Sequence, residues 1–214
     1  MTNSTHSNLR HMFSLKNALM ERRIRTERSN TFERLFGLDT KAMRKTYGDS
    51  ASRSLRQPDV AYPVVQDLAE AGIKALFAQF QVCESDADPL VQAATRGYEP
   101  AGGAAYRKAG EGAHFHIHLS RAPKFAGVVV SLVSDDAEVF HRIADCGFSP
   151  PPPWTVFPNL DPLGLGALQG DVAYWWRQFW SPFWNSLSPV ERDTYLTSNN
   201  ASADWADCVR RHSM

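Results

Sequence analysis

Cysteine is scarce in this chain, and the few cysteines are not spaced for cross-linking or for a thiolate metal site. The 214 residues include three of them, Cys83, Cys146 and Cys208, which are odd in number and far apart. No Cys-x-x-Cys pair occurs, so the sequence indicates neither a disulfide framework nor a zinc ribbon. A reducing compartment is the natural inference, and we expect a cytoplasmic protein.

Long apolar runs and two common functional motifs are also missing. No run approaches the roughly 18 apolar residues that a membrane-spanning helix needs, so we expect no membrane span. The sequence has neither a Walker A motif nor a Gly-x-Ser-x-Gly motif. An apolar content of 43% and a charged content of 21% nevertheless exclude a disordered chain, and they predict a soluble globular protein with one substantial core.

The formal net charge is zero, but two parts of the chain differ in sign. Residues 1–60 carry twelve Lys and Arg against six Asp and Glu, whereas residues 61–214 carry eleven against seventeen. The basic part is suited to nucleic acid or an acidic partner, and the plainer alternative is a solvated helical arm. The first twenty residues contain no acid and are rich in Ser, Thr and Asn, so secretion or transit through a signal other than a Sec signal stays open.

Composition and turn signals divide the chain into three predicted parts. Residues 1–58 form a basic helical arm and linker, and residues 59–149 form the core that holds a histidine-rich strand. Residues 150–214 form a proline spacer and an aromatic helical C-terminal section. The helices of the arm are expected near residues 8–28, 31–36 and 40–47, the last two being separated near Gly37.

We predict an α+β fold with a small antiparallel sheet and packed helices. Pro63 suits the first turn of a helix that runs to about Phe80, with an apolar stripe that includes Leu68 and Leu76. Residues 84–112 are rich in Pro, Gly and acids, and most of this segment is expected to be loop.

A hairpin is expected next in the core. Strands at residues 114–119 and 126–133 are joined by a short turn at 120–124, a length that favours antiparallel pairing. A helix over residues 135–146 should follow, with Asp135 and Glu138 as a capping box. This helix and the one at 63–80 are expected to pack on the sheet.

The C-terminal section is marked by its tryptophans. A helix that carries several of them should end at Pro182, and Ser188 with Glu191 predicts a capping box at the start of a helix over residues 189–196. A last helix should carry Trp205 and Val209. Aromatic residues on one helix face are typical of a core, and the functional alternative is a partner-binding surface made of Trp175, Trp176, Trp180 and Trp184.

The segment His114-Phe115-His116-Ile117-His118-Leu119 carries the strongest functional signal. Side chains two apart on a strand share a face, so the three imidazoles point one way and the three apolar side chains point the other way. Imidazoles on a half-buried strand are costly to bury unless each finds a hydrogen-bond partner, a metal or a ligand.

Three interpretations of the histidine face are open. In the first, it is a solvent-facing strand surface without chemistry. In the second, His114 and His116 hold zinc or another divalent metal, with His141, Asp135, Glu111 or a cysteine as a further ligand. The outer two histidines stand roughly 13 Å apart along a strand, so all three do not easily share one ion.

The third interpretation rests on a resemblance. His114-Phe115-His116-Ile117-His118-Leu119-Ser120 resembles the histidine triad signature His-φ-His-φ-His-φ-φ at six of seven positions and departs from it at Ser120. This resemblance implies a nucleotide hydrolase or transferase in which His116 attacks an α-phosphate. It also implies that His114 and His118 orient His116 and share its proton load. A neutral, oriented imidazole is what nucleophilic catalysis requires.

Two functions from different classes follow from these patterns. The leading hypothesis is a hydrolase centred on His116, with His114 and His118 beside it, that acts on a phosphate ester or another hydrolysable bond. Metal-bound water and a histidine nucleophile are both open as its mechanism, and a small molecule or a nucleotide is the expected substrate. The alternative is a non-catalytic interaction module, of the immunity or adaptor type, that binds a protein through its aromatic C-terminal surface.

Overall fold

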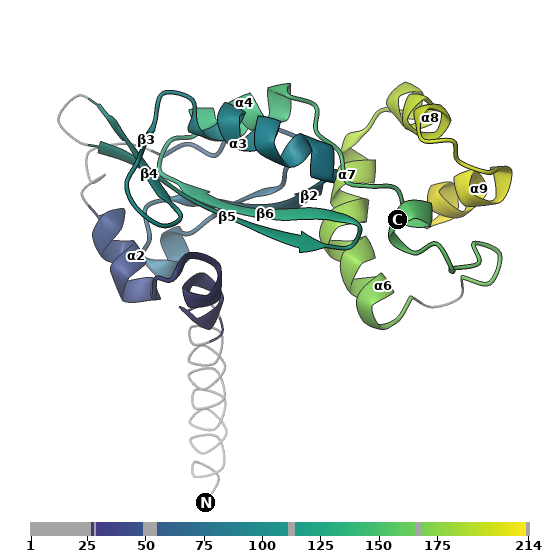
Figure 1. Ribbon diagram of the computed structural model, residues 1–214, viewed down its shortest axis with the longest axis horizontal. Helices are drawn as coiled ribbons and strands as arrows, with labels where there is room; N and C mark the ends of the chain where they lie inside the picture. The colour runs from purple at the N-terminus through teal and green to yellow at the C-terminus, as the bar shows by residue number, and fades with distance from the viewer. Residues whose placement is uncertain (1–26, 28, 49–54, 111–113, 166–167, 213–214) are drawn as a thin grey trace, which may run out of the picture.

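The protein is built around a six-stranded antiparallel sheet. The computed structural model describes residues 27, 29–48, 55–110, 114–165 and 168–212. The α+β fold that the sequence predicts is confirmed (Figure 1). The strands are β1 (Val65–Asp67), β2 (Leu76–Val82), β3 (Glu99–Pro100), β4 (Ala105–Ala109), β5 (His114–Lys124) and β6 (Gly127–Ser134). Their order across the sheet is β1-β2-β6-β5-β4-β3, so the central pair is the β5–β6 hairpin with β2 beside β6.

The predicted hairpin is present with longer strands and a shorter turn. β5 and β6 pair from Ile117 opposite Ser134 to Lys124 opposite Gly127. Phe125 and Ala126 alone form the turn, with φ angles of 57° and 54°. Two consecutive residues with positive φ are typical of a two-residue hairpin loop, because this backbone conformation matches the twist of the flanking strands. Residues 120–124, expected as the turn, therefore continue β5.

Two helices cover one face of the sheet, α3 (Ala87–Thr95) and α4 (Glu138–Asp145), as Figure 1 shows. Val139, Phe140 and Ile143 of α4 lie in one buried cluster with Ile117 and Leu119 of β5. The apolar side chains of the histidine strand therefore face this helical layer, and its histidines face the other way.

The opposite face of the sheet carries the N-terminal helices. Residues 29–36 are helical, Gly37 breaks the chain direction with a φ of 70°, and α2 (Thr40–Thr46) follows with Asp39 as its N-cap. These positions confirm the short helices expected at 31–36 and 40–47. A shared buried cluster joins these helices to β6, and its members include Phe32, Phe36, Met43, Tyr47 and Val133.

The C-terminal section packs against the hairpin end of the sheet. Its helices are α5 (Pro153–Val156), α6 (Gly170–Trp175), the π-helix η4 (Trp176–Trp180), α7 (Ser181–Ser186), α8 (Pro189–Ser198) and α9 (Ala203–Arg211). The capping box of Ser188 and Glu191 is formed, and the last helix carries Trp205 and Val209, as predicted. A buried aromatic cluster joins this section to Val129 of β6.

The prediction of a helix over residues 63–80 is wrong. The segment forms β1, the short 3-10 helix η2 (Ala69–Ala71) and β2. Gly72 lies between η2 and β2 and has a φ of 69°. An α-helix does not continue through this left-handed conformation. Leu76, Ala78, Phe80 and Val82 are buried at every second position, which is the period of a strand.

Two further predictions on this side of the core are wrong. Residues 84–112 are not mostly loop, because they contain the 3-10 helix η3 (Glu84–Asp86), α3, β3 and β4. The capping box of Asp135 and Glu138 does not form, since Ala137 is the N-cap of α4 and it is Asp136 that accepts the backbone N–H of Glu138. Asp135 instead accepts a hydrogen bond from the backbone N–H of His116 on β5.

Pro182 does not end the tryptophan-rich helix, contrary to the prediction. The helix continues through α7 to Ser186, directly after the π-helical segment η4. A proline ring clashes with the carbonyl one turn before it in a regular α-helix. The wider π-helical turn before Pro182 gives a physical reason why the chain stays helical here.

Some predictions fall outside the described residues. Almost all of the helix expected at 8–28 and much of the linker at 48–58 lie there, as does Glu111. The three-part division at residues 58 and 149 stays a prediction. Within the part of the chain that the structure describes, no helix is both long enough and apolar enough to cross a membrane.

Candidate functional site

The three histidines of β5 share one face of the sheet but differ in exposure. His114 is exposed, His116 is half-buried and His118 is buried. Ile117 and Leu119, which alternate with them, are buried in the opposite layer. The expected strand and its two faces are therefore confirmed, and burial increases from His114 to His118.

His118 is held as a packing residue by the N-terminal helices. Its Nδ1 lies 2.7 Å from the hydroxyl of Tyr47, which donates a hydrogen bond to the carbonyl of Val133 at 3.2 Å. The ring of Phe36 lies 6.1 Å from the imidazole. The pKa of His118 is lowered to about 4, chiefly by burial and in part by a charge on His116, while Asp135 opposes the change. His118 is therefore neutral at pH 7 and out of reach of a substrate.

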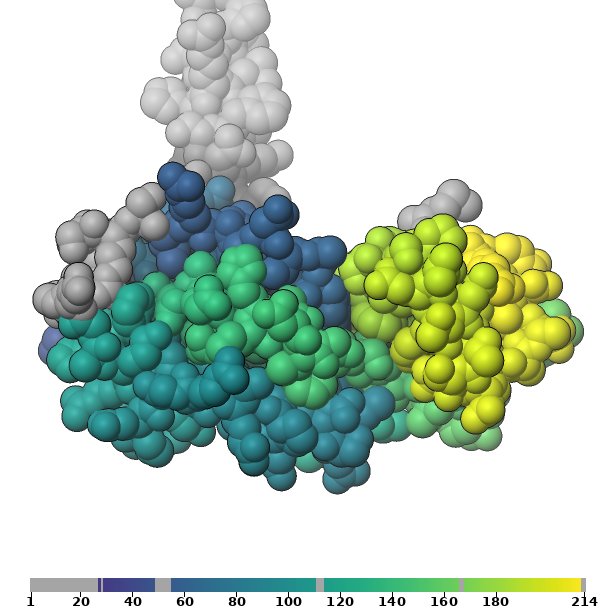
Figure 2. All heavy atoms as spheres, turned by 90° about the horizontal axis from the view of Figure 1, so that it is seen from above, coloured from purple at the N-terminus to yellow at the C-terminus, as the bar shows by residue number. Residues whose placement is uncertain are grey.

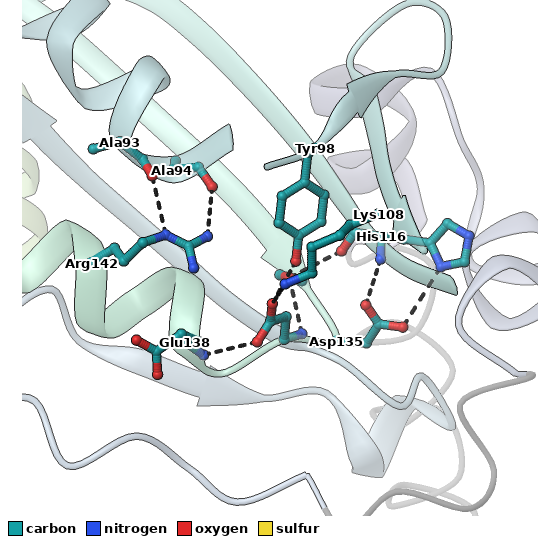
Figure 3. Close-up of polar contacts among 10 residues, drawn as sticks. Ala93, Ala94, Tyr98, Lys108, His116, Asp135, Glu138 and Arg142 are labelled. Carbon is teal, nitrogen blue, oxygen red and sulfur yellow. Dashed lines mark hydrogen bonds and ion pairs between the residues drawn. The ribbon is translucent and has the colours of Figure 1, made fainter. Parts of the chain in front are cut away.

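His116 faces a buried carboxylate. One oxygen of Asp135 accepts the backbone N–H of His116 at 2.7 Å, and the other lies 3.7 Å from the ring nitrogen Nδ1 (Figure 3). The side chain of Asp135 is 1% exposed and that of His116 is 25% exposed. A separation of 3.7 Å is an ion-pair contact and is longer than a hydrogen bond.

The two ring nitrogens of His116 have different surroundings. Nδ1 is buried and makes no hydrogen bond, so the exposed part of the ring lies elsewhere. Figure 3 shows the second ring nitrogen pointing away from Asp135. A carboxylate beside Nδ1 favours the tautomer with its proton on Nδ1, and this leaves the lone pair of Nε2 directed away from Asp135.

The turn that presents Asp135 is fixed by its neighbours. The hydroxyl of Ser134 donates to the carbonyl of His116 at 3.0 Å and accepts the N–H of Asp136 at 3.1 Å. These bonds tie the end of β6 to β5 at the level of His116. The position of the Asp135 carboxylate is therefore set by backbone contacts on both sides of it.

Asp136 turns to the other side of the sheet. Its Oδ2 accepts hydrogen bonds from the Tyr98 hydroxyl and the Lys108 ammonium, each at 2.7 Å, and Oδ1 accepts the N–H of Glu138 at 3.1 Å. Burial raises the pKa of Asp136, but Lys108 and Tyr98 more than offset this, so the pKa lies below its usual value. The Lys108 ammonium also lies 4.7 Å from the ring centre of Phe115.

A cation lies beside His116 on the neighbouring strand. Arg107 of β4 is directly opposite His116 of β5 in the register. Opposed residues on antiparallel strands point to the same face, with Cβ atoms about 5 Å apart. Arg107 is exposed, and the ring of His114 lies 6.4 Å from that of His116. Arg107, His114 and His116 therefore share one face of the sheet, which also carries Glu99 opposite Arg107.

The structure does not bring His141 to this group. His141 lies on α4, the helix that packs on the opposite face of the sheet, and it lines a cavity that none of the β5 histidines lines. Among the described residues, no cluster of three or more His, Cys, Asp or Glu side chains is arranged to hold a metal ion. The metal site of His114, His116 and His141 stays a prediction.

The four tryptophans expected at a partner surface are buried. Trp175, Trp176, Trp180 and Trp184 are each at most 3% exposed. They pack in the aromatic cluster of the C-terminal section, and Trp175 donates its indole N–H to Gln81 of β2 at 2.6 Å. The prediction that they form a docking surface is therefore wrong, and the alternative that they form a core is confirmed.

Sequence reasoning missed several residues that complete the histidine site. The sequence patterns do not indicate Tyr47, Arg107 or Asp136, and they indicate Asp135 as a helix cap or a further metal ligand. Tyr47 precedes His118 by 71 positions, so no local pattern relates the two. The pair Asp135-Asp136 directly after a Val-rich strand was the one available signal, because two acids at a strand end face opposite sides of a sheet.

Comparisons of the chain with protein-family models, with curated proteins and with solved structures find no match. Function is therefore inferred from the residues of the site.

Proposed function

We propose that the protein is a hydrolase in which Nε2 of His116 is the reactive atom and Asp135 is its orienting partner. The observation that carries the proposal is the contact between Nδ1 of His116 and the buried carboxylate of Asp135 at 3.7 Å. A half-buried imidazole with one edge on a fixed carboxylate and the other edge exposed is suited to proton transfer or nucleophilic attack.

The carboxylate acts on His116 in two ways. It keeps the proton of the neutral ring on Nδ1, so the lone pair is on the exposed Nε2. It also stabilises the positive charge that the ring gains when Nε2 accepts a proton from water or bonds to a substrate atom. The short 2.7 Å bond from the backbone N–H of His116 to Asp135 holds both groups in place before reaction.

A phosphate ester is the substrate class that the surroundings favour. Arg107 and His114 lie on the same face as His116 and can bind phosphate oxygens. The likeness of residues 114–120 to the histidine triad signature also favours phosphate chemistry at His116. Because His118 is buried against Tyr47, it supports the strand and is left out of the reacting group.

The test is a panel of chromogenic esters. The full chain is assayed with p-nitrophenyl phosphate, bis(p-nitrophenyl) phosphate and p-nitrophenyl acetate, with EDTA and with added Zn²⁺. We expect turnover of a phosphate ester, and a fall in kcat of about 10²–10⁴-fold in His116→Ala. Asp135→Asn should lower kcat as well. His212→Ala, which changes a histidine in contact with Trp176, is the matched control and should keep the activity.

The outcome against the proposal is equally definite. The proposal fails if the chain hydrolyses no ester in the panel. It also fails if the His116→Ala variant hydrolyses the same ester as fast as the unaltered chain. Elemental analysis of the untagged chain beside His114→Ala/His116→Ala distinguishes the two mechanisms. About one zinc per chain that is lost in the double variant would assign the reaction to metal-bound water.

The predicted partners have less support from the structure than the proposed hydrolase does. The interaction module was expected to use the four tryptophans named above, and their burial removes that surface. Nucleic acid at the basic N-terminal arm stays a prediction, because residues 1–26 lie outside the described part of the chain. A cytoplasmic location and a bound divalent metal likewise stay predictions.

A further inference from the structure

A cavity of about 470 Å³ lies on the α4 side of the sheet, away from the histidine face. It forms where residues 59–63, the end of α4 and the junction between α7 and α8 meet. Figure 2 shows the green surface around α4 meeting the yellow-green surface of α8. A volume of roughly 300–1,000 Å³ is usual for sites that bind small molecules.

The inner wall of the cavity is aromatic. Tyr62, Phe80, Phe148 and Phe183 line it, and the ring of Tyr62 lies 5.5 Å from that of Phe183 in an edge-to-face arrangement. Phe80 and Phe183 are buried, so the wall belongs to the packed core and is already formed. Such a wall accommodates an apolar group, and ring faces attract a cation placed near them.

The rim of the cavity carries acidic groups from three separate elements. Asp59, Asp145 and Glu191 line it and are exposed, and His141 of α4 lies among them. None of the described lining residues is Lys or Arg. Glu191 accepts the backbone N–H of Ser188 at 2.7 Å, which fixes its carboxylate at the start of α8. The entrance is therefore negative, and the aromatic rings lie at the inner wall behind it.

We propose that this cavity binds a small organic cation with an apolar body, such as an aromatic amine, with the ring inside and the ammonium group at the acidic rim. Apolar and aromatic surface provides attraction without direction, and the carboxylates select the charge. The site is separate from His116, which lies on the other face of the sheet, so it does not depend on the function proposed above.

Isothermal titration of the full chain with three probes of one shape tests the proposal. The probes are benzylamine, benzyl alcohol and benzoate. We expect saturable binding of benzylamine that exceeds benzyl alcohol by about fivefold or more, since each exposed ion pair contributes a factor of about two to five. Binding of benzylamine should weaken as salt is added, and benzoate should not bind.

Variants locate the binding. Asp59→Asn/Asp145→Asn should weaken benzylamine by about fivefold, and Asp171→Asn, an exposed carboxylate on α6 outside the lining, should not. Ala144→Phe fills the cavity and should abolish binding, with far-ultraviolet circular dichroism as the check on folding. His116→Ala should bind benzylamine like the unaltered chain.

Three results would overturn the proposal. These are absence of saturable benzylamine binding, equal binding of benzyl alcohol, and binding that the Asp59→Asn/Asp145→Asn variant leaves unchanged. The charge variant changes exposed groups only, so the test stands even if Ala144→Phe does not fold.

Discussion

The two ends of β6 are stabilised by different chemistry. At the end near Gly127, the strand meets the aromatic cluster of the C-terminal section through Val129. At the other end, the chain continues into the polar turn at residues 134–136, which ties β6 to β5 and β4 through side-chain hydrogen bonds. One sheet thus has an apolar anchor at one end and a hydrogen-bonded site at the other.

The two ends also differ in whether their buried polar atoms have hydrogen-bond partners. In the aromatic cluster, the indole nitrogens of Trp176, Trp180 and Trp184 are buried without hydrogen-bond partners. Each such group costs about 1–3 kcal/mol, which the burial of large rings offsets. At the polar end, the side chains of Ser134 and Asp136 are hydrogen-bonded. Nδ1 of His116 is the exception there, and it faces a carboxylate.

This difference between the two ends of β6 indicates which end can position a reactive side chain. Stability that comes from ring packing tolerates unsatisfied donors, because the rings remove so much apolar area from water. A reactive imidazole needs a fixed polar neighbour, and the turn at 134–136 supplies one. The aromatic end therefore contributes to folding stability through apolar packing, and the polar end holds His116 in position through hydrogen bonds.

Trp180→Ala should have the largest effect on stability. Trp180 is 1% exposed and lies 5.2 Å from Trp184, 5.7 Å from Tyr195 and 5.9 Å from Trp175, measured between ring centres. Removing so large a buried ring is expected to cost about 3–5 kcal/mol of unfolding free energy. Urea titration measures the loss. Trp154→Ala, at a half-buried tryptophan, is the matched control and should lose less.

If Trp180→Ala cost no more than Trp154→Ala, the aromatic end would not be the main anchor of the fold, and the comparison would fail on that side.

Acidification should destabilise the chain through His118 by an amount nearly as large. Burial holds the pKa of His118 at about 4 in the folded chain, against 6.5 for the free group. The unfolded chain therefore binds more protons between pH 6.5 and pH 4, so this contribution to stability is full above pH 6.5 and is lost as the pH falls toward 4. The shift corresponds to about 3 kcal/mol.

Urea titrations at several pH values in this window measure the effect. His118→Gln removes the titrating group and should give a shallower dependence on pH than the unaltered chain. His114→Gln changes the exposed neighbour and should leave the slope as it is. Equal slopes in the unaltered chain and in His118→Gln would contradict a buried, neutral His118.

Much of the fold could be predicted because local signals determine it. The alternation of residues 114–119 gave the strand and its two faces, and Ser188 with Glu191 gave the start of α8. Both signals act within a few residues, where the geometry of a strand or a helix start leaves little choice.

The segment at 63–80 shows why other elements could not be predicted. Leu76 and Phe80 are four apart and fit a helix, but they are also even-numbered positions of a strand. The distinction depends on Gly72 adopting a φ of 69° and on pairing of β2 with β6, about 50 positions later. The local pattern of residues does not indicate which distant strands pair.

The candidate site could be predicted in part for the same reason. The histidine face follows from local alternation, whereas the partners of each histidine come from distant segments. Tyr47 reaches His118 from α2, Asp135 reaches His116 from the end of β6, and Arg107 is placed by the register of β4. These contacts give His116 and His118 different roles, one beside a carboxylate and the other in the core. The repeated motif alone does not distinguish the two histidines.

Asp136→Asn should have the smallest of the three effects and bears on the polar end alone. The carboxylate accepts hydrogen bonds from Tyr98 and Lys108, and an amide in its place would set an NH₂ group against one of these donors. Bonds to a charged group contribute about 1.5–3 kcal/mol, so a loss of about 2 kcal/mol is expected at pH 7.

The pKa of Asp136 is lowered in the folded chain, so its contribution is full above the ordinary carboxylate pKa and disappears on acidification below it. Asp88→Asn breaks the exposed ion pair with Arg121 and is the matched control, with an expected change within about 0.5 kcal/mol. Urea titration at pH 7 compares the two variants. If they lost equal stability, the hydrogen bonds of the turn at 134–136 would not stabilise the polar end. The fixed position of Asp135 beside His116 would then need another cause.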